Sequence, residues 1–339
     1  MNTVDGRKEK KHYIYIFVIL LIIIFLLSFT IGRYPISIGL LLKVLFSKVL
    51  PIVKTWPETI DTIVFKVRLP RIIGAMLVGA SLSVSGAVYQ GMFKNPLVSP
   101  DILGVTSGSA FGAALAIFLS FNTVEIQISS FIFGLIGVSL VYLISKRIKD
   151  DPLITLVITG VLVGSIFTSL TSLIKYLADT DDKLPTITFW LMGSLTGISP
   201  KDIKTVLIPI LLGMIPLYIL RWHLNVLSLE EDEAKTLGLD TGKLRVIVIA
   251  CSTLMTAAAV SISGMIGWIG LVIPHLSRMI VGPDYRVLLP TTILLGSSYL
   301  LLIDNIARAL TTVEIPLGIL TSLVGAPFFI FLLLTNRRS

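Results

Sequence analysis

The sequence predicts an all-α polytopic membrane protein, and three observations support that class. Of the 339 residues, 54% are hydrophobic and only 14% are charged, whereas ordinary soluble domains carry about 25% charged residues. The mean hydropathy is +0.92. The apolar residues gather in runs of about 20, the length that one helical crossing of a bilayer needs. We expect about ten transmembrane helices in a single domain.

The first run, 14–31, follows a basic tail at residues 1–12. A basic head before an apolar run is also typical of a secretory signal peptide, but this run is longer than usual and no small-residue cleavage site follows it. We therefore expect a retained first crossing. Basic residues that flank a crossing usually stay in the cytoplasm, which places the tail inside through Arg7, Lys8, Lys10 and Lys11.

The remaining runs are separated by polar breaks and put both termini inside. They cover about 71–90, 102–121, 126–145, 153–176, 203–220, 246–263, 268–281, 287–309 and 317–334. Residues 13–339 then form one transmembrane domain. Within it we expect an outer interfacial segment at 32–70, with two short amphipathic helices, and an inner polar region at 221–245.

Two short segments resemble each other and suggest an inverted internal repeat. "SVSGAVYQGMFKNPLV" at 83–98 is similar to "SISGMIGWIGLVIPHL" at 261–276, and in both a glycine precedes a proline by ten residues. In the expected topology the copies are five crossings apart, so they would run in opposite directions, as in many transporters. Chance similarity between two apolar, glycine- and serine-rich segments is the alternative.

The polar residues exclude several classes of function. The net charge of +8 does not indicate nucleic-acid binding, because the basic residues are scattered at the ends of apolar runs, where they meet lipid headgroups. Cys251 is the only cysteine, which leaves neither a disulfide nor a cysteine-based metal site. The three histidines share no ligand spacing, and no nucleophile stands beside a base. We expect no catalytic residue, no metal and no cofactor.

Charged residues within the apolar runs are scarce. Asp304 and Arg308 lie four apart on one expected helix, a spacing that lets them pair and makes their burial tolerable. The same scarcity counts against a carrier that is driven by an ion gradient. The runs are rich instead in Gly, Ala and Ser, which let helices pack closely; a fraction of them would line a path for a large, rigid solute.

The polar region 221–245 contains one short expected helix. Ser228 is a good N-cap, acidic residues follow it, and Leu237-Gly238 has the pattern of a helix end. This helix is either a solvated connector or a docking element for a soluble partner. The neighbouring "GLDTGKLR" is not a phosphate-binding loop, because its glycines are too close and Leu244 stands where a hydroxyl is required.

Arg68 and Arg71 lie at the start of the second run, on the side opposite the N-terminus. Because basic residues usually stay inside, this placement needs a separate explanation. The inner side is expected to hold only slightly more Lys and Arg than the outer side, because much of the outer basic charge lies within 32–71. Either the side chains reach lipid phosphates, or they bind a partner.

Three long segments resemble the FecCD-type permeases, the membrane subunits of ABC importers for ferric siderophores, haem and cobalamin. They are "RLPRIIGAMLVGASLSVSGAVYQGMFKNPLVSPDILGVTSGSAFGA", "GMIGWIGLVIPHLSRMIVGPDYRVLLP" and "DNIARALTTVEIPLGILTSLVGAPFFIFLLL". The likeness covers nearly the whole chain from Arg68 onward. One departure is Glu230, which follows "LSL" where a glycine is usual. The signature residues, expected to be structural, are Gly86, Gln90, Asn95, Pro96, Gly104, Pro274 and His275.

The resemblance implies a fold and a set of partners. The fold is that of the cobalamin-importer permeases, with about ten crossings and an inverted repeat. The partners are a second permease subunit (identical or related), two cytoplasmic ATP-binding subunits, an extracytoplasmic substrate-binding protein and membrane lipid, but no nucleic acid. The chain itself then catalyses no reaction, because ATP hydrolysis belongs to a partner.

The resemblance also implies roles for particular residues. Arg68, Arg71 and Arg308 would face outward and meet acidic residues of the binding protein, which suits the two hydrogen bonds that one guanidinium donates to a carboxylate. The 221–245 region would dock on the ATPase. The residues expected to do so are Ser228, Leu229, Glu231, Ala234, Leu237 and Gly238.

The sequence therefore predicts a multi-pass permease subunit of an ATP-driven importer in the cell membrane. We expect it to form the path for an iron–siderophore complex, with haem and cobalamin as further cargoes to test. An ion-coupled secondary transporter is the alternative, and it would need intramembrane acids besides Asp304. An intramembrane enzyme would need a motif such as H-E-x-x-H or G-x-S-x-G, and neither occurs.

Overall fold

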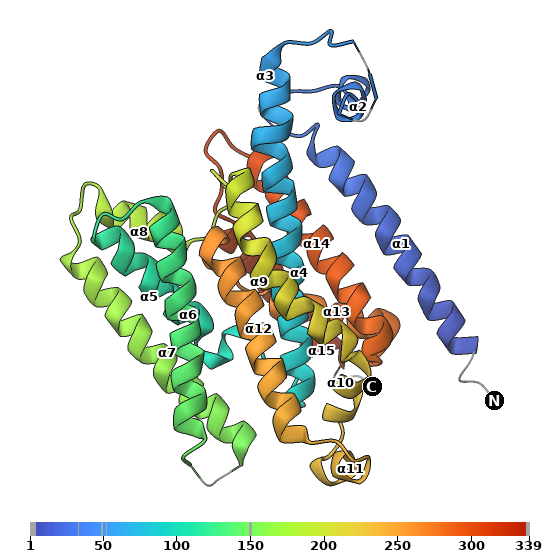
Figure 1. Cartoon of the computed structure of the whole chain (residues 1–339), viewed down its shortest axis with the longest axis vertical. Helices are drawn as coiled ribbons and strands as arrows, with labels where there is room; N and C mark the ends of the chain where they lie inside the picture. The colour runs from blue at the N-terminus through green and yellow to red at the C-terminus, as the bar shows by residue number, and fades with distance from the viewer. Residues whose placement is uncertain (1–4, 33, 49, 52, 149–150, 337–339) are drawn as a thin grey trace.

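The structure is a computed structural model that describes residues 5–32, 34–48, 50–51, 53–148 and 151–336 (Figure 1). In this part of the chain every regular element is helical, which confirms the predicted all-α class. Ten apolar helices coincide with the ten predicted runs. Six are long enough to cross a membrane: Glu58–Met92, Thr123–Ser145, Pro152–Leu177, Pro200–Ile219, Thr241–Ser263 and Tyr285–Ala309. The four shorter ones are His12–Ser28, Val105–Phe118, Ile269–Val281 and Leu317–Phe331.

The chain begins with a helix that runs along one side of the bundle. α1, Asp5–Ser28, packs against α14, Tyr285–Ala309. It is followed by α2, Ile38–Phe46, whose N-cap Ser37 accepts a hydrogen bond from the backbone of Leu40. α2 matches the first of the two expected outer helices. It lies beside α3 at the top of Figure 1, and we call this the α3 end of the molecule.

The second expected outer helix is not a separate element. α3, Glu58–Asp61, continues through a π-helical turn, Thr62–Arg68, into α4, Leu69–Met92. Pro70 has no N–H to donate, and the wide turn before it lets the helix continue past that residue. The segment therefore extends the second long helix beyond the bundle instead of lying apart from it.

α4 is the centre of the bundle and packs against α12, Thr241–Ser263, α13, Ile269–Val281, and α14. Two close approaches depend on the absence of side chains. A Cβ at Gly79 would lie 2.2 Å from the carbonyl oxygen of Gly296, and one at Gly86 would lie 1.8 Å from that of Gly270. At these positions the small residues serve close helix packing.

A second group of helices lies beside α4 and α12, drawn in green on the left of Figure 1. A short 3-10 turn, Pro100–Leu103, leads into it. Its members are α5, Val105–Phe118, α6, Thr123–Ser145, α7, Pro152–Leu177, and α8, Lys183–Leu191. The sequence did not predict α8, because an acidic, polar stretch precedes it and its nine residues are too few for a crossing.

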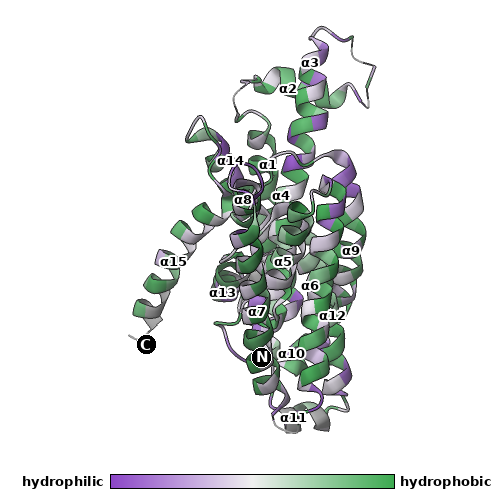
Figure 2. Cartoon of the chain, turned by 90° about the vertical axis from the view of Figure 1, so that its left-hand side faces the viewer, coloured by the Kyte–Doolittle hydropathy of each residue, from purple (hydrophilic) through white to green (hydrophobic). Residues whose placement is uncertain are grey.

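The opposite end of the molecule carries two short helices. α9, Pro200–Ile219, leads into α10, Arg221–Leu227, and then α11, Glu231–Thr236, before α12 begins. We call this the α11 end (Figure 1). Exposed apolar side chains cover the middle of the helices, and the polar residues gather toward the two ends (Figure 2).

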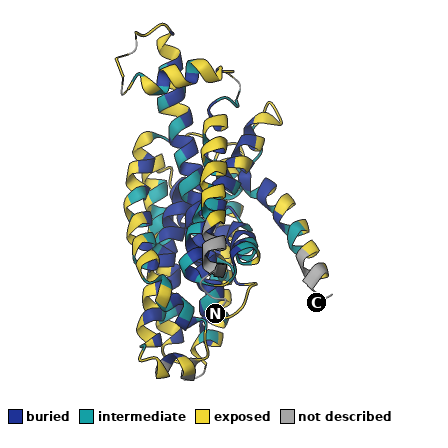
Figure 3. Cartoon of the chain, turned by 90° about the vertical axis from the view of Figure 1, so that its right-hand side faces the viewer, coloured by how far each residue is buried: buried dark blue, intermediate teal, exposed yellow. Residues whose placement is uncertain are grey.

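The last helix leaves the body of the molecule. α15, Leu317–Asn336, projects from the bundle and exposes much of its surface (Figure 3). Its outer residues are large and apolar, among them Leu323 at 66% and Ile330 at 58% exposure. A surface of this kind needs lipid or another protein against it.

Candidate docking and coupling sites at opposite ends

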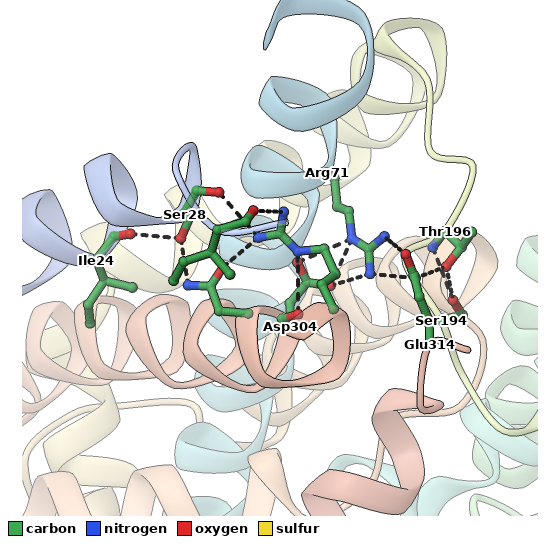
Figure 4. Close-up of polar contacts among 10 residues, drawn as sticks. Ile24, Ser28, Arg71, Ser194, Thr196, Asp304 and Glu314 are labelled. Carbon is green, nitrogen blue, oxygen red and sulfur yellow. Dashed lines mark hydrogen bonds and ion pairs between the residues drawn. The ribbon is translucent and has the colours of Figure 1, made fainter. Parts of the chain in front are cut away.

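The α3 end contains a buried network of charged side chains, which we call the arginine network (Figure 4). Arg71 on α4 and Arg308 on α14 both pair with Asp304, which also lies on α14. Nη2 of Arg71 is 2.9 Å from Oδ1 of Asp304, and Nε of Arg308 is 3.1 Å from Oδ2. The predicted Asp304–Arg308 pair is therefore confirmed, and Arg71 joins it as a third member.

Glu314, in the turn between α14 and α15, completes the network. Nη2 of Arg71 lies 2.9 Å from Oε2 of Glu314, and Thr196, in the turn between α8 and α9, donates a hydroxyl hydrogen bond to the same oxygen. Partial burial tends to raise the pKa of Glu314, but the hydrogen bonds from Arg71 and Thr196 outweigh it and hold this pKa below its ordinary value. The glutamate thus remains a carboxylate at neutral pH.

The far side of the network reaches α1. Arg308 donates to the backbone oxygen of Ile31 at 3.2 Å and also to the side chain of Asn305. Asn305 in turn donates to the hydroxyl of Ser28, where α1 ends, at 2.8 Å. The arginine network therefore ties together α1, α4, α14, the turn between α8 and α9, and the turn between α14 and α15.

Arg68 stands apart from the carboxylates. Its guanidinium donates to the backbone oxygens of Phe29 and Tyr34, in the segment that follows α1. The residue is only 5% exposed.

The three arginines predicted to dock a partner thus cluster at one end, as expected, but their side chains point inward. Arg71 is 8% exposed and Arg308 is 9% exposed. Each guanidinium already donates to acceptors of its own chain. Their positions in the sequence could place the three arginines at the same end of the molecule. They could not show that Glu314 of the same chain accepts hydrogen bonds from Arg71, in competition with a partner's carboxylate.

The α11 end contains the region predicted to couple to an ATPase, and one detail of that prediction is wrong. Ser228 does not cap the acidic helix. It ends α10 instead, and its hydroxyl donates to the backbone oxygen of Leu224 at 3.1 Å. The acidic helix starts three residues later, at Glu231, because Ser228 is taken up by the preceding helix.

The other residues of the predicted coupling set lie on and around α11. Leu229 and Leu237 are exposed, whereas Ala234 is buried. Gly238 has φ +75°, the left-handed conformation expected of a glycine that follows a helix. The side chain of Glu231 lies outside the described part of the structure.

A second polar cluster joins this region to the bundle. We call it the inner hub, and its members are Gln90, Asn225, Arg278, Asp284 and Tyr285. The amide of Asn225 on α10 donates to Oδ1 of Asp284 at 2.8 Å, and its oxygen accepts from the backbone N–H of Tyr285 at 2.8 Å. The buried hydroxyl of Tyr285 donates to the backbone oxygen of Ala87 on α4 at 2.6 Å.

The hub continues to the start of α13. Arg278 donates to the side-chain oxygen of Gln90 and, at 2.9 Å, to the backbone oxygen of Ala87. Gln90 in turn donates to the backbone oxygen of Leu271 at 3.2 Å. A cavity of about 490 Å³ lies beside these residues, and Asn95, Pro96, Ser228 and Leu229 contribute to its wall.

The signature residues are placed at breaks and close contacts. Gly104 has φ +76° at the start of α5, where only a residue without Cβ fits without strain. Asn95 accepts from the backbone of Leu97 at 2.9 Å. Pro274 lies within α13, and His275 stacks edge-on against Phe329 of α15 with ring centres 6.1 Å apart.

A larger cavity of about 910 Å³ lies at the α3 end, between α6, α8, the start of α9 and the end of α12. Gln127, Thr196, Asp202 and Glu314 supply much of its polar wall, and Trp190 part of its apolar wall. None of the described residues that line it is Lys, Arg or His. The sequence did not identify this cavity, since its wall is assembled from six separate segments.

A bundle of apolar helices with polar clusters at its two ends defines a multi-pass membrane protein of the transport class. Among the described residues no group of His, Cys, Asp and Glu is arranged to hold a metal ion. The profile of the FecCD transport family matches residues 20–335. The chain therefore belongs to the FecCD family of ABC-importer permeases, whose members are not enzymes themselves.

Individual relatives differ in the cargo that their names give. The molybdate import system permease protein MolB of Haemophilus influenzae is 45% identical over 94% of both chains. An iron chelatin transport permease of Helicobacter pylori is 42% identical over 83% of this chain and 85% of its own. The cobalamin import permease BtuC of Halobacterium salinarum is 42% identical over 82% of this chain and 74% of its own.

Solved structures agree with the fold. One, assigned to the metal-chelate type of ABC transporter and described as inward-facing, has a TM-score of 0.86, with 43% identity over 96% of this chain and 99% of that one. A chain of PsaBC from Streptococcus pneumoniae has a TM-score of 0.53 at 19% identity, covering 81% of this chain and 94% of that one. The second similarity concerns the fold alone.

Proposed function

We propose that this chain forms the translocation path of an ATP-driven importer for a metal chelate, with an iron–siderophore complex as the cargo. The family match over residues 20–335 carries the first part of the proposal. The 910 Å³ cavity supports the second, because the described residues that line it include two carboxylates and no basic residue. Such a wall suits a neutral or cationic complex that offers hydrogen-bond donors.

Molybdate import is the second candidate, favoured by the 45% identity to MolB. The two cargoes are separated by uptake into proteoliposomes that contain the complete importer and its own binding protein. Radioactive iron bound to a hydroxamate siderophore and radioactive molybdate serve as the probes. Accumulation of molybdate without iron would reject the proposed cargo and leave the importer assignment intact.

The ATP requirement distinguishes this proposal from an ion-coupled transporter. We expect uptake to need ATP on the α11 side and to survive an ionophore that collapses ion gradients. The scarcity of charged residues along the helices supports this expectation, since Asp304 is neutralised by two arginines. Uptake that the ionophore abolishes while ATP is present would favour the secondary transporter.

For the topology we propose ten crossings, with the α3 end outside and both termini inside. An inverted repeat is part of this proposal. α4 and α12 run in opposite directions and pack together, and each is followed by a break and a shorter helix, α5 of 14 residues and α13 of 13. Labelling of single cysteines introduced at Lys66 and Glu233 with an impermeant reagent tests the orientation. Only the first should react in intact cells.

We propose two partners in or on the membrane, a second permease subunit and lipid. α15 and the outer face of α7 expose large apolar side chains, such as Ile166 at 59% and Leu323 at 66%. These surfaces would face the second subunit across the cargo path or face the acyl chains. Cross-linking between cysteines placed on α15 in two copies tests the dimer.

At the α3 end we propose that the extracytoplasmic binding protein docks near Arg68, Arg71 and Arg308. Since Glu314 now occupies Arg71, an acidic residue of the binding protein would take its place on docking. Exchanging Arg68 and Arg71 for Glu should abolish uptake while basal ATP hydrolysis by the complex persists. Lys201→Glu is the matched control, because Lys201 is exposed on the same end.

At the α11 end we propose that Ser228, Leu229, Glu231, Ala234, Leu237 and Gly238 form the surface to which two ATP-binding subunits attach. Deletion of 229–238 should release the ATPase from the detergent-purified complex. The exposure of Leu229 and Leu237 supports this, since two apolar side chains on a polar segment favour a protein contact. Continued co-purification of the ATPase would reject the assignment.

A further inference from the structure

The segment that would carry the ATPase is attached to the bundle at a point where polar contacts concentrate. α10 packs through Leu224 and Leu227, which are buried in the core. Asn225, between them, makes the directional contacts to another helix, by way of Asp284 and Tyr285 at the first turn of α14. One side chain therefore fixes the register of α10 against α14.

From α14 the contacts lead onward to two other helices. The hydroxyl of Tyr285 and the guanidinium of Arg278 both donate to the backbone oxygen of Ala87 in α4, so α13 and α14 contact α4 at the same carbonyl. Gln90 joins the same group to Leu271 in the first turn of α13. That turn follows the break between α12 and α13, where Trp268 has φ +69°.

The hub is close-packed on one side and open on the other. A Cβ at Gly91 would lie 2.0 Å from the hydroxyl of Tyr285 and 2.9 Å from that of Ser228, so the helices are in contact there. The 490 Å³ cavity borders the same residues. Hydrogen bonds beside free space can hold one arrangement and still allow a second.

We propose that Asn225, Asp284 and Tyr285 are positioning residues that pass ATP-driven movement of α10 and α11 to α4 and α13. This inference rests on the proposed function and adds the residues that connect the ATPase-binding segment to the bundle. Arg278 and Gln90 extend the connection to the break before α13. As positioning residues they act through the helices that they join, and this role needs no contact with the cargo.

The pair Asn225–Asp284 allows a swap that tests whether these hydrogen bonds themselves carry the coupling. Asn225→Asp places two carboxylates face to face and removes the amide donor. Asp284→Asn retains an acceptor for Asn225 and for the backbone N–H of Arg286. The double variant Asn225→Asp, Asp284→Asn restores all three hydrogen bonds with the partners exchanged.

The experiment uses the complete importer, purified with its ATPase and reconstituted. Hydrogen exchange is measured at residues 269–281 without nucleotide and with ATP and vanadate. In the wild type, nucleotide should change exchange there. In Asn225→Asp that change should fall by at least half and uptake by about tenfold, the effect of one lost hydrogen bond and a new charge repulsion. Asp284→Asn should lie near the wild type, and the swap should recover most of the response.

Each result has a separate meaning. A wild-type response in Asn225→Asp, with the ATPase still attached, would overturn the inference alone. Equal loss in Asn225→Asp and in the swap would also overturn it, since the restored hydrogen bonds would not restore coupling. Failure of the wild-type chain to bind any ATPase would overturn the proposed function, and the inference with it.

Discussion

The two ends of the molecule use polar side chains in different ways. At the α3 end, Arg71, Asp304 and Arg308 form an ion-paired cluster in which the side chain of Asp304 is fully buried. At the α11 end, each hydrogen bond of Asn225 and Tyr285 has at least one neutral partner, and these residues lie beside a cavity. Charges removed from water separate only at a large cost, whereas neutral contacts exchange partners more easily. The first arrangement suits an end that holds its shape, and the second suits an end that moves.

The largest expected effect comes from removing the central carboxylate of the arginine network. Asp304→Ala leaves Arg71 and Arg308 near each other without their shared partner, which should cost about 3–5 kcal/mol of stability. Thermal unfolding in detergent measures this loss. Asp181→Ala is the control, because Asp181 is exposed in the turn before α8, is not the N-cap of that helix, and should change little. An unchanged midpoint in Asp304→Ala would mean that the network does not hold the α3 end together.

A smaller effect is expected from filling the contact at the inner hub. Gly91→Ala places a methyl group against the hydroxyl of Tyr285, and the resulting overpacking should cost about 1–3 kcal/mol. Gly39→Ala is the matched control, since a Cβ at Gly39 meets no atom within 4 Å. If Gly91→Ala were as damaging as Asp304→Ala, the two ends would not differ in rigidity as argued above.

Glu314→Gln should have the smallest effect at neutral pH. Arg71 keeps Asp304, and the amide of the new glutamine can still accept one hydrogen bond from Arg71, so the expected loss is about 1 kcal/mol. The measurement is again thermal unfolding, carried out beside the wild type. A loss comparable with that of Asp304→Ala would show that Arg71 depends on Glu314 and Asp304 equally.

The same variant gives a pH prediction with a definite sign. The folded-state pKa of Glu314 lies below the ordinary 4.5. Its contribution is therefore complete above pH 4.5 and is lost as the pH falls through the folded-state pKa. The stability difference between wild type and Glu314→Gln should stay constant from pH 7 to about pH 5 and shrink in more acidic solution. A difference that shrinks already near pH 6 would contradict the lowered pKa.

Much of the fold could be predicted because each helix is encoded locally. The apolar runs fixed the positions of the ten apolar helices, and the four-residue spacing of Asp304 and Arg308 predicted their pair. The prediction that Ser228 caps the acidic helix was wrong, because the preceding helix α10 already uses this serine at its own C-terminal end. The π turn before Pro70 has no local signal that distinguishes it from a helix start.

The long-range partners could not be predicted for a different reason. Arg71 meets Glu314 across 243 residues of chain, and Asn225 meets Asp284 across 59. Neither pair shares a helix face, so no periodicity connects them. The resemblance to the FecCD family indicated which arginines to examine, but the carboxylates that hold them follow only from the packing of α4 against α14.

The Arg71–Asp304 pair joins residues that are 233 positions apart, and this separation matters while the chain is being made. α4 leaves the ribosome early and must enter the bilayer with Arg68 and Arg71 near the terminus that later forms part of the α3 end. Asp304, the carboxylate that pairs with Arg71, is synthesised only when α14 emerges. Until then, lipid headgroup phosphates are the counter-charge available to these arginines. The depth of the early helices in the bilayer therefore becomes final only when the last fifth of the polypeptide has been inserted.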